Sequence, residues 1–569
     1  MNSIHVEKSP STELAAPGCS DAALGGAAAL GGAAAPRRRR FFEGPSPLKI
    51  WVAAVSLAGL AGCASTSKSQ KPAPAVATAA AAPPAYPHTP DAAFRDAKPA
   101  PLPGTPHFQA PVPVERKLKN GLRVLINENH QVPLVVADLV IETGINGNPL
   151  AKPGLAEFTA AMLDEGTQTE SSLQIAAKLE DLAAQLSASA SSDSTEVDLN
   201  CLTETLPQAL DVMADVALHP AFKAADIARV KKAYLTGLAQ QQVMPGFLAQ
   251  NAARRVLYGE ASPWGQPVGG TIAAVTKLGT RDLQSFHKTY FVPQNAVLVV
   301  SGDVTPDALV KLLDARFGHW KGKTPRKATV ALPPPNTQRK ILVIDHPGTQ
   351  SRVAVVHRML TAASPDVVPM KTANYILGGL FSSRLNLNLR EDKAYSYGVF
   401  SRIAFNSETG VFSAQGNIIA QHTPEAIAEM EKEFDRFKDG KVSPEELHAA
   451  KSAYVRSLPS LLETNGAVAG SIAELVIDGL PLDYFVTLPA KVAAVTDADI
   501  ARVAQVYVQP QTWPVVVVGP VHDQMDRLKA LNLGSVEALD LGQRGVSHTP
   551  SKAGAKRAGP RHQAKTPAK

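Results

Sequence analysis

Two short motifs recur in the same order along the 569-residue chain, and they constrain its fold more than any other feature. Lys-Lys-Ala-Tyr-Leu-Thr-Gly-Leu at 231–238 matches Lys-Ser-Ala-Tyr-Val-Arg-Ser-Leu at 451–458. Tyr-Phe-Val-Pro-Gln at 290–294 matches Tyr-Val-Gln-Pro-Gln at 507–511, and an apolar run ending in glycine follows each. Nearly equal separations indicate a duplicated unit rather than chance. We therefore predict two homologous halves.

Strand and helix patterns alternate in a similar way in both halves. Apolar alternation or short apolar runs predict strands at 121–126, 134–142, 195–201, 340–345, 353–359, 397–406 and 411–419. Helical spacing predicts helices at 154–165, 172–187, 207–218, 223–242, 280–290, 370–380, 424–439, 444–458 and 497–507. Strands mixed with segregated helices predict an α+β fold, built as two tandem homologous α/β sandwich domains.

Composition indicates where the folded body begins and ends. Residues 63–111 are rich in Ala and Pro without apolar periodicity, which predicts an extended or flexible tether. Residues 542–569 are polar and basic, which predicts a disordered tail. The body between them is predicted as an N-terminal domain at 112–325 and a C-terminal domain at 337–541.

Residues 1–62 predict a secretory signal peptide with an unusually long basic region before its apolar run. The apolar run at 50–61 is too short to span a bilayer, and it ends in Leu-Ala-Gly followed by Cys63. This ending resembles the bacterial lipobox, which implies lipidation of Cys63 and a periplasm-facing lipoprotein of the cell envelope. Ala64 after the cysteine fits sorting to the outer membrane. An uncleaved apolar patch is the alternative.

The formal charge of +6 does not predict a nucleic-acid-binding surface. Arg37 to Arg40 and the tail after His548 carry much of the basic excess. No basic face with interleaved aromatic residues is visible in the body, so we expect no nucleic-acid partner.

Residues 154–167 predict one amphipathic helix with a glycine near each end. The apolar residues at helical spacing are Leu155, Phe158, Met162 and Leu163. The frame G-L-A-x-F-x-x-x-M-L-x-x-G-T resembles the signature helix of the pitrilysin/insulinase family of zinc metallopeptidases, which includes the mitochondrial processing peptidases. In that family the helix carries H-x-x-E-H, whose histidines bind zinc and whose glutamate acts as general base. Here these positions are Glu157, Ala160 and Ala161.

The resemblance extends over nearly the whole body. The matching segments are 118–124, 263–267 with Gly270-Thr271, 378–385, 389–398, 463–465 and 479–481. It implies a metallopeptidase LuxS/MPP-like fold in which two α+β halves pack face to face. Two such units enclose a chamber in which peptide is cut.

The third zinc ligand of the family also has no counterpart in this sequence. The family places a glutamate near the end of a later helix, and residues 235–238 contain no carboxylate there. Because a zinc hydrolase needs three protein ligands and a base near the bound water, we expect no metal in this chain. Glu157, Asp164 and Glu165 are interpreted as surface carboxylates, not as a substitute site.

A second motif of the family is intact. The segment 389–398 matches one in which an arginine and a tyrosine seven residues apart act on substrate, and these are Arg390 and Tyr397. The resemblance implies that they hold the substrate carbonyl and the developing oxyanion. The alternative is that Arg390 caps a helix and Tyr397 is a half-buried strand residue.

Gly378 and Gly379 open the family's glycine-rich segment. They predict either a helix stop or a mobile loop that contacts substrate.

These patterns predict the non-catalytic subunit of a two-chain zinc peptidase. The partner would be a homologous chain that keeps H-x-x-E-H and binds the zinc, while this chain supplies Arg390 and Tyr397 to peptide substrate. The alternative is a lipoprotein that binds peptide by strand addition or acts as a scaffold, with no role in cleavage.

Overall fold

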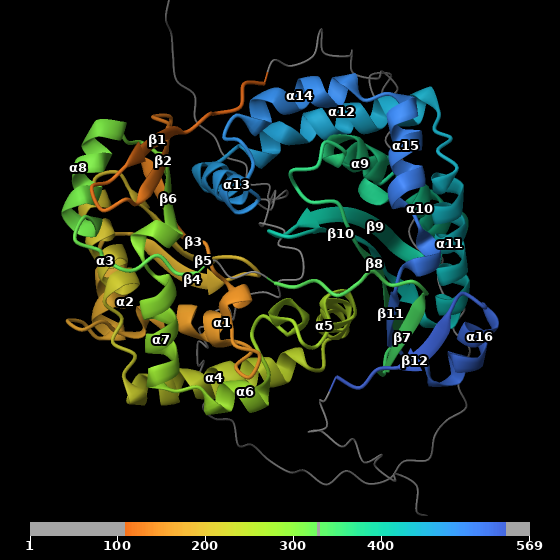
Figure 1. The fold of residues 1–569 in the computed structure, drawn as a ribbon, viewed down its shortest axis with the longest axis horizontal. Helices are drawn as coiled ribbons and strands as arrows, with labels where there is room; N and C mark the ends of the chain where they lie inside the picture. Colours follow the sequence, from red (N-terminus) through yellow and green to blue (C-terminus); the bar gives the residue numbers. More distant parts are fainter. Residues whose placement is uncertain (1–107, 327–329, 542–569) are drawn as a thin grey trace, which may run out of the picture. The chain divides into compact units, whose positions relative to one another are not determined.

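The computed structural model describes residues 108–326 and 330–541 (Figure 1). The predicted signal peptide, Cys63, the tether and the basic tail lie outside these residues. The described chain forms two α+β halves, as predicted, and each half contains one six-stranded sheet. Within the two described ranges, no helix combines the length and the apolar character that a membrane span requires.

The N-terminal sheet has the strand order β1-β2-β6-β3-β5-β4. Its strands are β1 (Val114–Lys117), β2 (Arg123–Glu128), β3 (Leu134–Ile141), β4 (Gln185–Ala190), β5 (Thr195–Leu202) and β6 (Ala296–Gly302). The α-helices of this half are α1 (Leu155–Ala160), α2 (Ser172–Asp181), α3 (Leu206–Leu218), α4 (Ala224–Gln241), α5 (Pro245–Tyr258), α6 (Ile272–Lys277), α7 (Thr280–Tyr290) and α8 (Pro306–Phe317).

The C-terminal sheet has the order β12-β7-β11-β8-β10-β9. Its strands are β7 (Lys340–Asp345), β8 (Gln350–Met359), β9 (Ser396–Phe405), β10 (Gly410–Ile419), β11 (Val515–Gly519) and β12 (Ser535–Ala538). The α-helices are α9 (Val367–Asn374), α10 (Arg384–Asn386), α11 (Thr423–Lys438), α12 (Pro444–Leu461), α13 (Asn465–Ile477), α14 (Tyr484–Ala494), α15 (Asp497–Tyr507) and α16 (Met525–Ala530).

The duplication predicted from the sequence is visible in the strand connections. β2 runs parallel to β6 in the first sheet, and β7 runs parallel to β11 in the second. The remaining pairs, β6–β3–β5–β4 and β11–β8–β10–β9, are antiparallel in both sheets. The halves differ in their outermost strand, since β1 is antiparallel to β2 whereas β12 is parallel to β7.

The repeated Lys-x-Ala-Tyr motif has the same structural role twice. Tyr234 of α4 and Tyr454 of α12 are both buried. Tyr234 contacts the ring of Phe158 with 5.1 Å between ring centroids, and Tyr454 contacts Tyr375 at the same separation. Tyr234 therefore joins α4 to α1, and Tyr454 joins α12 to the π-helical turn that directly follows α9.

The two halves are joined by a reciprocal exchange of helices (Figure 1). α5 of the N-terminal half packs on β8 and β11, and α13 of the C-terminal half packs on β3 and β6. Val468 and Ile472 of α13 form a buried cluster with Val140, Val297 and other residues of the first sheet. The sequence did not predict α5 or α13. In α13 the apolar residues are not confined to one face, which removes the usual signal of a surface helix.

Two predicted helices are wrong in extent. The helix expected at 154–165 ends at Ala160, and a separate 3-10 turn follows at Leu163–Glu165. The helix expected at 172–187 ends at Asp181, and residues 185–190 form strand β4. Ala183 has a φ of 48° in between, and such a left-handed residue stops a helix.

Candidate functional site

Helix α1 is buried on every face, so the prediction of an amphipathic helix is wrong. All six of its residues are buried. Its N-cap, Gly154, has a φ of 90°, and a Cβ there would lie 2.6 Å from the carbonyl oxygen of Gly269. Glycine is therefore required at this position by both its conformation and the close approach of the loop.

Glu157 is not the surface carboxylate that the sequence predicted. Its residue is only 7% exposed, and its Oε2 accepts a hydrogen bond from the backbone amide of Ala190 at 2.6 Å. Ala190 is the last residue of β4, which forms the edge of its sheet among the described residues. The carboxylate therefore ties α1 to the edge of the sheet, and sequence periodicity could not reveal this tertiary contact.

The other positions of the zinc motif do not fit a metal. Ala160 is 1% exposed, and Ala161 packs against the apolar core. On α4, Leu238 is buried, and the Tyr234 hydroxyl donates to the Gly269 carbonyl at 3.0 Å. Burial, and secondarily the charge of Glu157, raises the pKa of Tyr234. One hydrogen-bonded carboxylate among apolar groups does not supply a zinc donor set.

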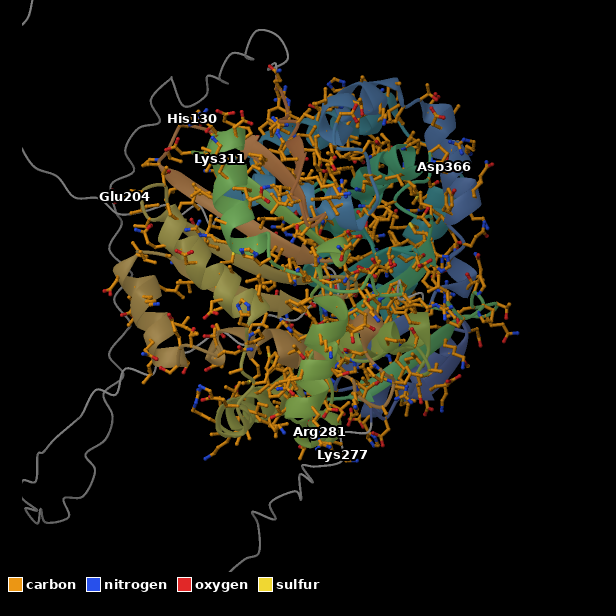
Figure 2. All side chains as sticks on the ribbon, turned by 60° about the vertical axis from the view of Figure 1, so that its left-hand side comes forward. His130, Glu204, Lys277, Arg281, Lys311 and Asp366 are labelled. Carbon is orange, nitrogen blue, oxygen red and sulfur yellow. The ribbon has the colours of Figure 1, made fainter. Side chains whose placement is uncertain are left out.

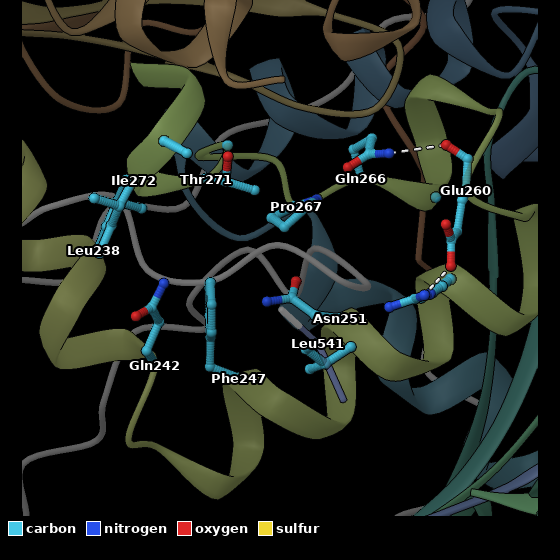
Figure 3. A pocket seen from close by; sticks show the side chains of 14 residues that line it. Leu238, Gln242, Phe247, Asn251, Glu260, Gln266, Pro267, Thr271, Ile272 and Leu541 are labelled. Atoms are coloured by element: carbon cyan, nitrogen blue, oxygen red, sulfur yellow. Dashed lines mark hydrogen bonds and ion pairs between the residues drawn. The ribbon is translucent and has the colours of Figure 1, made fainter. Parts of the chain in front are cut away.

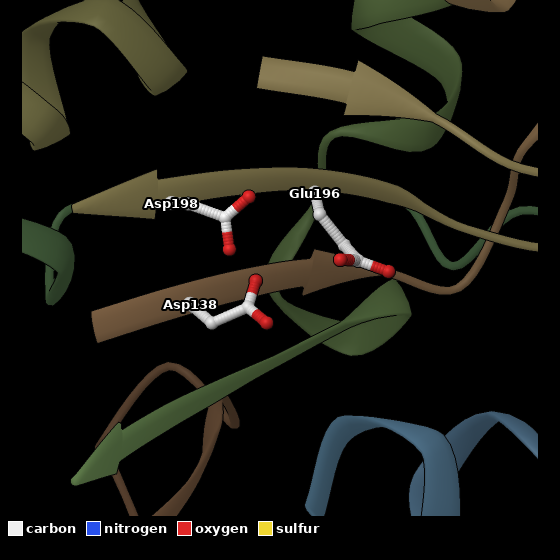
Figure 4. Close-up of side chains that lie close together, drawn as sticks. All are labelled: Asp138, Glu196 and Asp198. Atoms are coloured by element: carbon white, nitrogen blue, oxygen red, sulfur yellow. The ribbon is translucent and has the colours of Figure 1, made fainter. Parts of the chain in front are cut away.

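A carboxylate cluster lies elsewhere, on the N-terminal sheet (Figure 4). Asp138 of β3 and Asp198 of β5 are direct cross-strand partners, and Glu196 lies two residues along β5. Their nearest oxygens lie within 4.8 Å of one another. Ser194 donates a hydrogen bond to Glu196 at 2.9 Å, and both aspartates have interactions of their own. The cluster is separate from the family's zinc position and is not evidence for a metal.

Arg390 lies in a π-helical turn, Leu387–Asp392, close to the exposed ring of Phe381. Its guanidinium carbon is 3.9 Å from the ring centroid, and its Nη1 is 3.3 Å from Glu391 Oε1. The side chain is 31% exposed. The guanidinium is thus held in a defined direction while part of it remains open to a ligand.

Tyr397 is 91% exposed, so it is not the half-buried strand residue of the alternative interpretation. It lies in edge strand β9, where the pairing with β10 shifts between Val399–Gly416 and Ser396–Ile418. Tyr397 and Gly398 therefore oppose a single residue, Asn417, which defines a β-bulge.

The hydroxyl of Ser396 holds this bulge. It accepts a hydrogen bond from the Gly398 amide at 3.0 Å and donates to the Asn417 carbonyl at 2.8 Å. Bulges next to binding sites commonly re-aim a side chain, and this one directs a phenol into solvent.

The predicted glycines end a π-helical turn, Tyr375–Gly379. A Cβ on Gly378 would lie 2.3 Å from Ser401 Oγ and 2.8 Å from Ser401 N, so this glycine allows close contact with β9. Gly379 is less crowded, with the Asn374 carbonyl oxygen 3.1 Å from its Cβ position. Neither glycine has a positive φ.

His130 belongs to none of the motifs found in the sequence, and it lies on the surface of the N-terminal half (Figure 2). Its Nδ1 is 2.6 Å from Asp303 and its Nε2 is 2.8 Å from Glu128. Hydrogen bonding to Asp303, and then to Glu128, raises the pKa of His130. The three groups form a polar cluster at the surface, and nothing observed there indicates a ligand.

Comparison with known proteins identifies the family of this chain. The family model for insulinase, peptidase family M16, matches residues 123–260, and the model for the peptidase M16 inactive domain matches residues 277–454. The chain belongs to the insulinase family. The two matches together cover more than half of the chain. The first lies within the N-terminal half, and the second begins just before α7 of that half and ends within α12 of the C-terminal half.

Several relatives of the insulinase family are similar over most of the described body. An uncharacterized zinc protease, YmxG of Bacillus subtilis, is 25% identical over 61% of this chain and 84% of its own. The mitochondrial-processing peptidase subunit beta of Bos taurus is 24% identical over 72% and 84%. A non-peptidase homolog, YmxG of Helicobacter pylori, is 24% identical over 64% and 84%.

Solved structures support the same fold. The peptidase M16 inactive domain from Pseudomonas fluorescens superposes with a TM-score of 0.67 at 24% identity, covering 72% of this chain and 98% of that one. A protease from Helicobacter pylori gives 0.68 at 19% identity over 72% and 100%. With its zinc positions replaced, this insulinase-family chain is a non-catalytic M16-like protein.

Proposed function

We propose that this chain is the non-catalytic subunit of a two-chain zinc peptidase. Its partner would be a homologous chain with an intact H-x-x-E-H motif, which would bind the zinc. Arg390 and Tyr397 of this chain would contact peptide substrate from the opposite side of the shared chamber. The single observation that carries the proposal is the bulge of β9, which exposes 91% of Tyr397 in a half whose family motifs are intact.

A tyrosine that served only to stabilise the fold would be expected to bury its ring, and Tyr397 does not. A phenol in solvent contributes little to stability, and the neighbouring Phe381 and Phe400 are 60% and 45% exposed. Around Arg390 these rings form an exposed aromatic surface suited to an extended peptide or a partner chain. A fixed guanidinium and a phenol can both donate to a carbonyl or an oxyanion, which can be worth about 10²–10³ in rate.

Co-expression with a zinc-bearing relative from the same genome tests this proposal. Arg390→Ala and Tyr397→Phe should each lower peptide turnover by the purified pair by about 10²-fold. Arg456→Ala, an exposed arginine on α12, and Tyr395→Phe, two residues before Tyr397, serve as matched controls and should leave turnover unchanged. Unchanged turnover in both motif variants, with the pair intact, would show that the motif has no catalytic part.

A second candidate is a protein that binds peptide without cleavage, and the free edge of β4 favours it. Ser191 N donates to Ser194 O within the hairpin, so odd-numbered residues of β4 pair with β5. Leu186 and Ala188 then direct their amides and carbonyls outward, available for an added strand. Edge strand β9 is different, because Asn386 accepts from Val399 N at 3.0 Å along its outer side.

Substitution by proline separates the two candidates. Ala188→Pro removes an outward amide and should abolish peptide binding by the isolated chain without breaking the β4–β5 ladder. Ser187→Pro removes an inward amide and is the destabilising control. Peptide binding that depends on Ala188, without any stimulation of hydrolysis by a zinc-bearing chain, would favour the binding protein over the subunit.

The proposed location is the bacterial cell envelope, through a lipid on Cys63. The support is the lipobox-like sequence before Cys63, which lies outside the described residues. Mass spectrometry of the N-terminal peptide from the membrane fraction should show a diacylated cysteine. Cys63→Ala should abolish the modification and release the chain from membranes.

A further inference from the structure

The bulge that presents Tyr397 is not fixed by strand pairing alone. The extra residue of a bulge has no partner in the ladder, so the side chain that it directs needs other supports. On the side of β10 the support is the Ser396 hydroxyl, which accepts from the Gly398 amide and donates to the Asn417 carbonyl. On the outer side of β9 the support is Asn386, the last residue of α10.

Asn386 is fully buried, and both ends of its side-chain amide are hydrogen-bonded. Its Oδ1 accepts from the Val399 amide at 3.0 Å, two residues after Tyr397. Its Nδ2 donates to the Leu380 carbonyl at 3.0 Å. Because asparagine has an acceptor and a donor on one short side chain, it can join the amide of one backbone segment to the carbonyl of another.

The second of these segments carries the ring that holds Arg390. Leu380 directly precedes Phe381, and the guanidinium carbon of Arg390 lies 3.9 Å from the centroid of the Phe381 ring. Asn386 therefore contacts both the strand that presents Tyr397 and the turn that presents the stacking partner of Arg390.

A second link joins the two motif residues through their chain neighbours. The Tyr395 amide donates to the Leu389 carbonyl at 2.9 Å. Leu389 directly precedes Arg390, and Tyr395 lies two residues before Tyr397. One hydrogen bond alone would act as a hinge between the two segments. With Asn386 as a further link, the distance between the motif side chains is fixed at two separate places.

We propose that Asn386 is a positioning residue that holds the Tyr397 hydroxyl and the Arg390 guanidinium where both reach one substrate carbonyl. This inference rests on the proposed function of those two residues. Donors stabilise an oxyanion best when they do not have to reorient during the reaction. Asn386 is buried and acts through its neighbours, so its effect falls on kcat, which reports contacts made only in the transition state, and not on KM.

A double-mutant cycle in the co-expressed, purified pair tests the inference. Asn386→Ala should lower kcat by about 10-fold and change KM by less than about 2-fold. The same change in a Tyr397→Phe chain should cost less than about 3-fold, because only the Arg390 contact is left to misplace. A general loss of folded protein would instead give the same factor in both chains. Equal factors in the two chains would overturn the inference.

Hydrogen exchange of the isolated chain measures the coupling without a partner. Asn386→Ala should speed deuterium uptake by about 10-fold or more in peptides that cover 380–383 and 396–401. Asn386→Asp keeps the acceptor for the Val399 amide and loses the donor to Leu380, so uptake should rise only in the first peptide. Unchanged uptake in both peptides of the alanine variant would overturn the inference.

The matched control is Asn251→Ala. Asn251 is another buried asparagine, on α5 beside a cavity of about 410 Å³ in the N-terminal half (Figure 3). Its replacement should change neither turnover nor uptake in the two peptides.

The pattern of turnover separates this inference from the proposed function. If Arg390→Ala and Tyr397→Phe keep full turnover, the proposed function fails and the inference fails with it. If both lose turnover while Asn386→Ala keeps it, the inference alone fails.

Discussion

The carboxylate of Glu157 accepts a hydrogen bond from the backbone amide of Ala190 at 2.6 Å, and this joins α1 to edge strand β4. The second half has a corresponding contact, in which Asn374 Nδ2 donates to the Ser401 carbonyl of edge strand β9 at 3.1 Å. Each residue directly precedes the ring that packs on the repeated tyrosine. The position of the first zinc histidine therefore supports an edge strand in both halves of this chain.

Replacing Glu157 should cost stability, not activity. Glu157→Ala removes the acceptor and leaves the buried Ala190 amide unsatisfied, which should lower the free energy of unfolding by about 1–3 kcal/mol. Glu180→Ala, an exposed glutamate on α2, should change it by less than about 0.5 kcal/mol. Urea denaturation measures both, and equal effects of the two changes would refute a structural role for Glu157.

Restoring the family motif should not restore a zinc peptidase. The triple change Glu157→His, Ala160→Glu and Ala161→His enlarges a position that is 1% exposed and adds no third ligand near Leu238. Overpacking should lower stability by about 1–3 kcal/mol or more. Elemental analysis should find less than one zinc per chain, and peptide hydrolysis should stay at background. Stoichiometric zinc with turnover would contradict this account of the site.

The sequence was sufficient for the fold class and the duplication, because apolar periodicity and repeated motifs are local signals. Prediction from the sequence failed for elements whose burial depends on segments far away in the chain. The first residues of β4 were predicted as the end of a helix. The left-handed conformation of Ala183, which stops that helix, gives no signal in the sequence. Helices α5 and α13, which were not predicted, both pack on the sheet of the other half, a tertiary contact that local sequence does not encode.

The candidate site was likewise predictable only in part. The loss of zinc ligands at Ala160 and Ala161 can be read directly from residue types, since alanine offers no donor. The burial of Glu157 could not be predicted, because its partner Ala190 lies 33 residues away in a strand that was not expected. The exposure of Tyr397 depends on a β-bulge, and a bulge changes register without a clear signal in residue pattern.

The two glycines at the end of the π-helical turn should differ in their tolerance of a side chain. Gly378→Ala places a Cβ 2.8 Å from the Ser401 backbone nitrogen, so backbone must move, and stability should fall by about 2 kcal/mol or more. Gly379→Ala meets its nearest atom at 3.1 Å and should cost less than about 1 kcal/mol. Thermal unfolding of both variants measures the difference, and similar losses would show that the close contact with β9 is unimportant.

Arg390 and Tyr397 should be nearly dispensable for folding. Tyr397→Phe removes a hydroxyl from a side chain that is 91% exposed, and it should leave the unfolding temperature unchanged. Arg390→Ala loses one contact with Phe381, worth about 0.5–1 kcal/mol at such an exposed site. A large loss of stability in either variant would mean that the motif is retained for structure, so these measurements accompany the turnover assay.

The contact between the halves should weaken as pH rises through neutrality. Burial, and then the nearby Glu474, raises the pKa of Asp478 at the end of α13 to about 7 from its ordinary 3.8. Between about pH 4 and 7 the folded state holds a proton that the unfolded state has released, so its stabilising contribution is lost as pH rises through that window.

Asp478→Asn keeps the neutral form at every pH and should remove this dependence. Near pH 8 the variant should be more stable than the unaltered protein by about 2–4 kcal/mol, from about 1.4 kcal/mol for each unit of pKa shift. Below pH 4 the two proteins should be equally stable. Burial lowers the pKa of His287 and of His357 to about 4, which gives stability the opposite pH trend, but both histidines are present in both proteins and cancel in the difference. Urea denaturation from pH 4 to 8 measures that difference, with Asp497→Asn, an exposed aspartate, as the control. A pH-independent difference would show that Asp478 is already ionised at the contact between the halves.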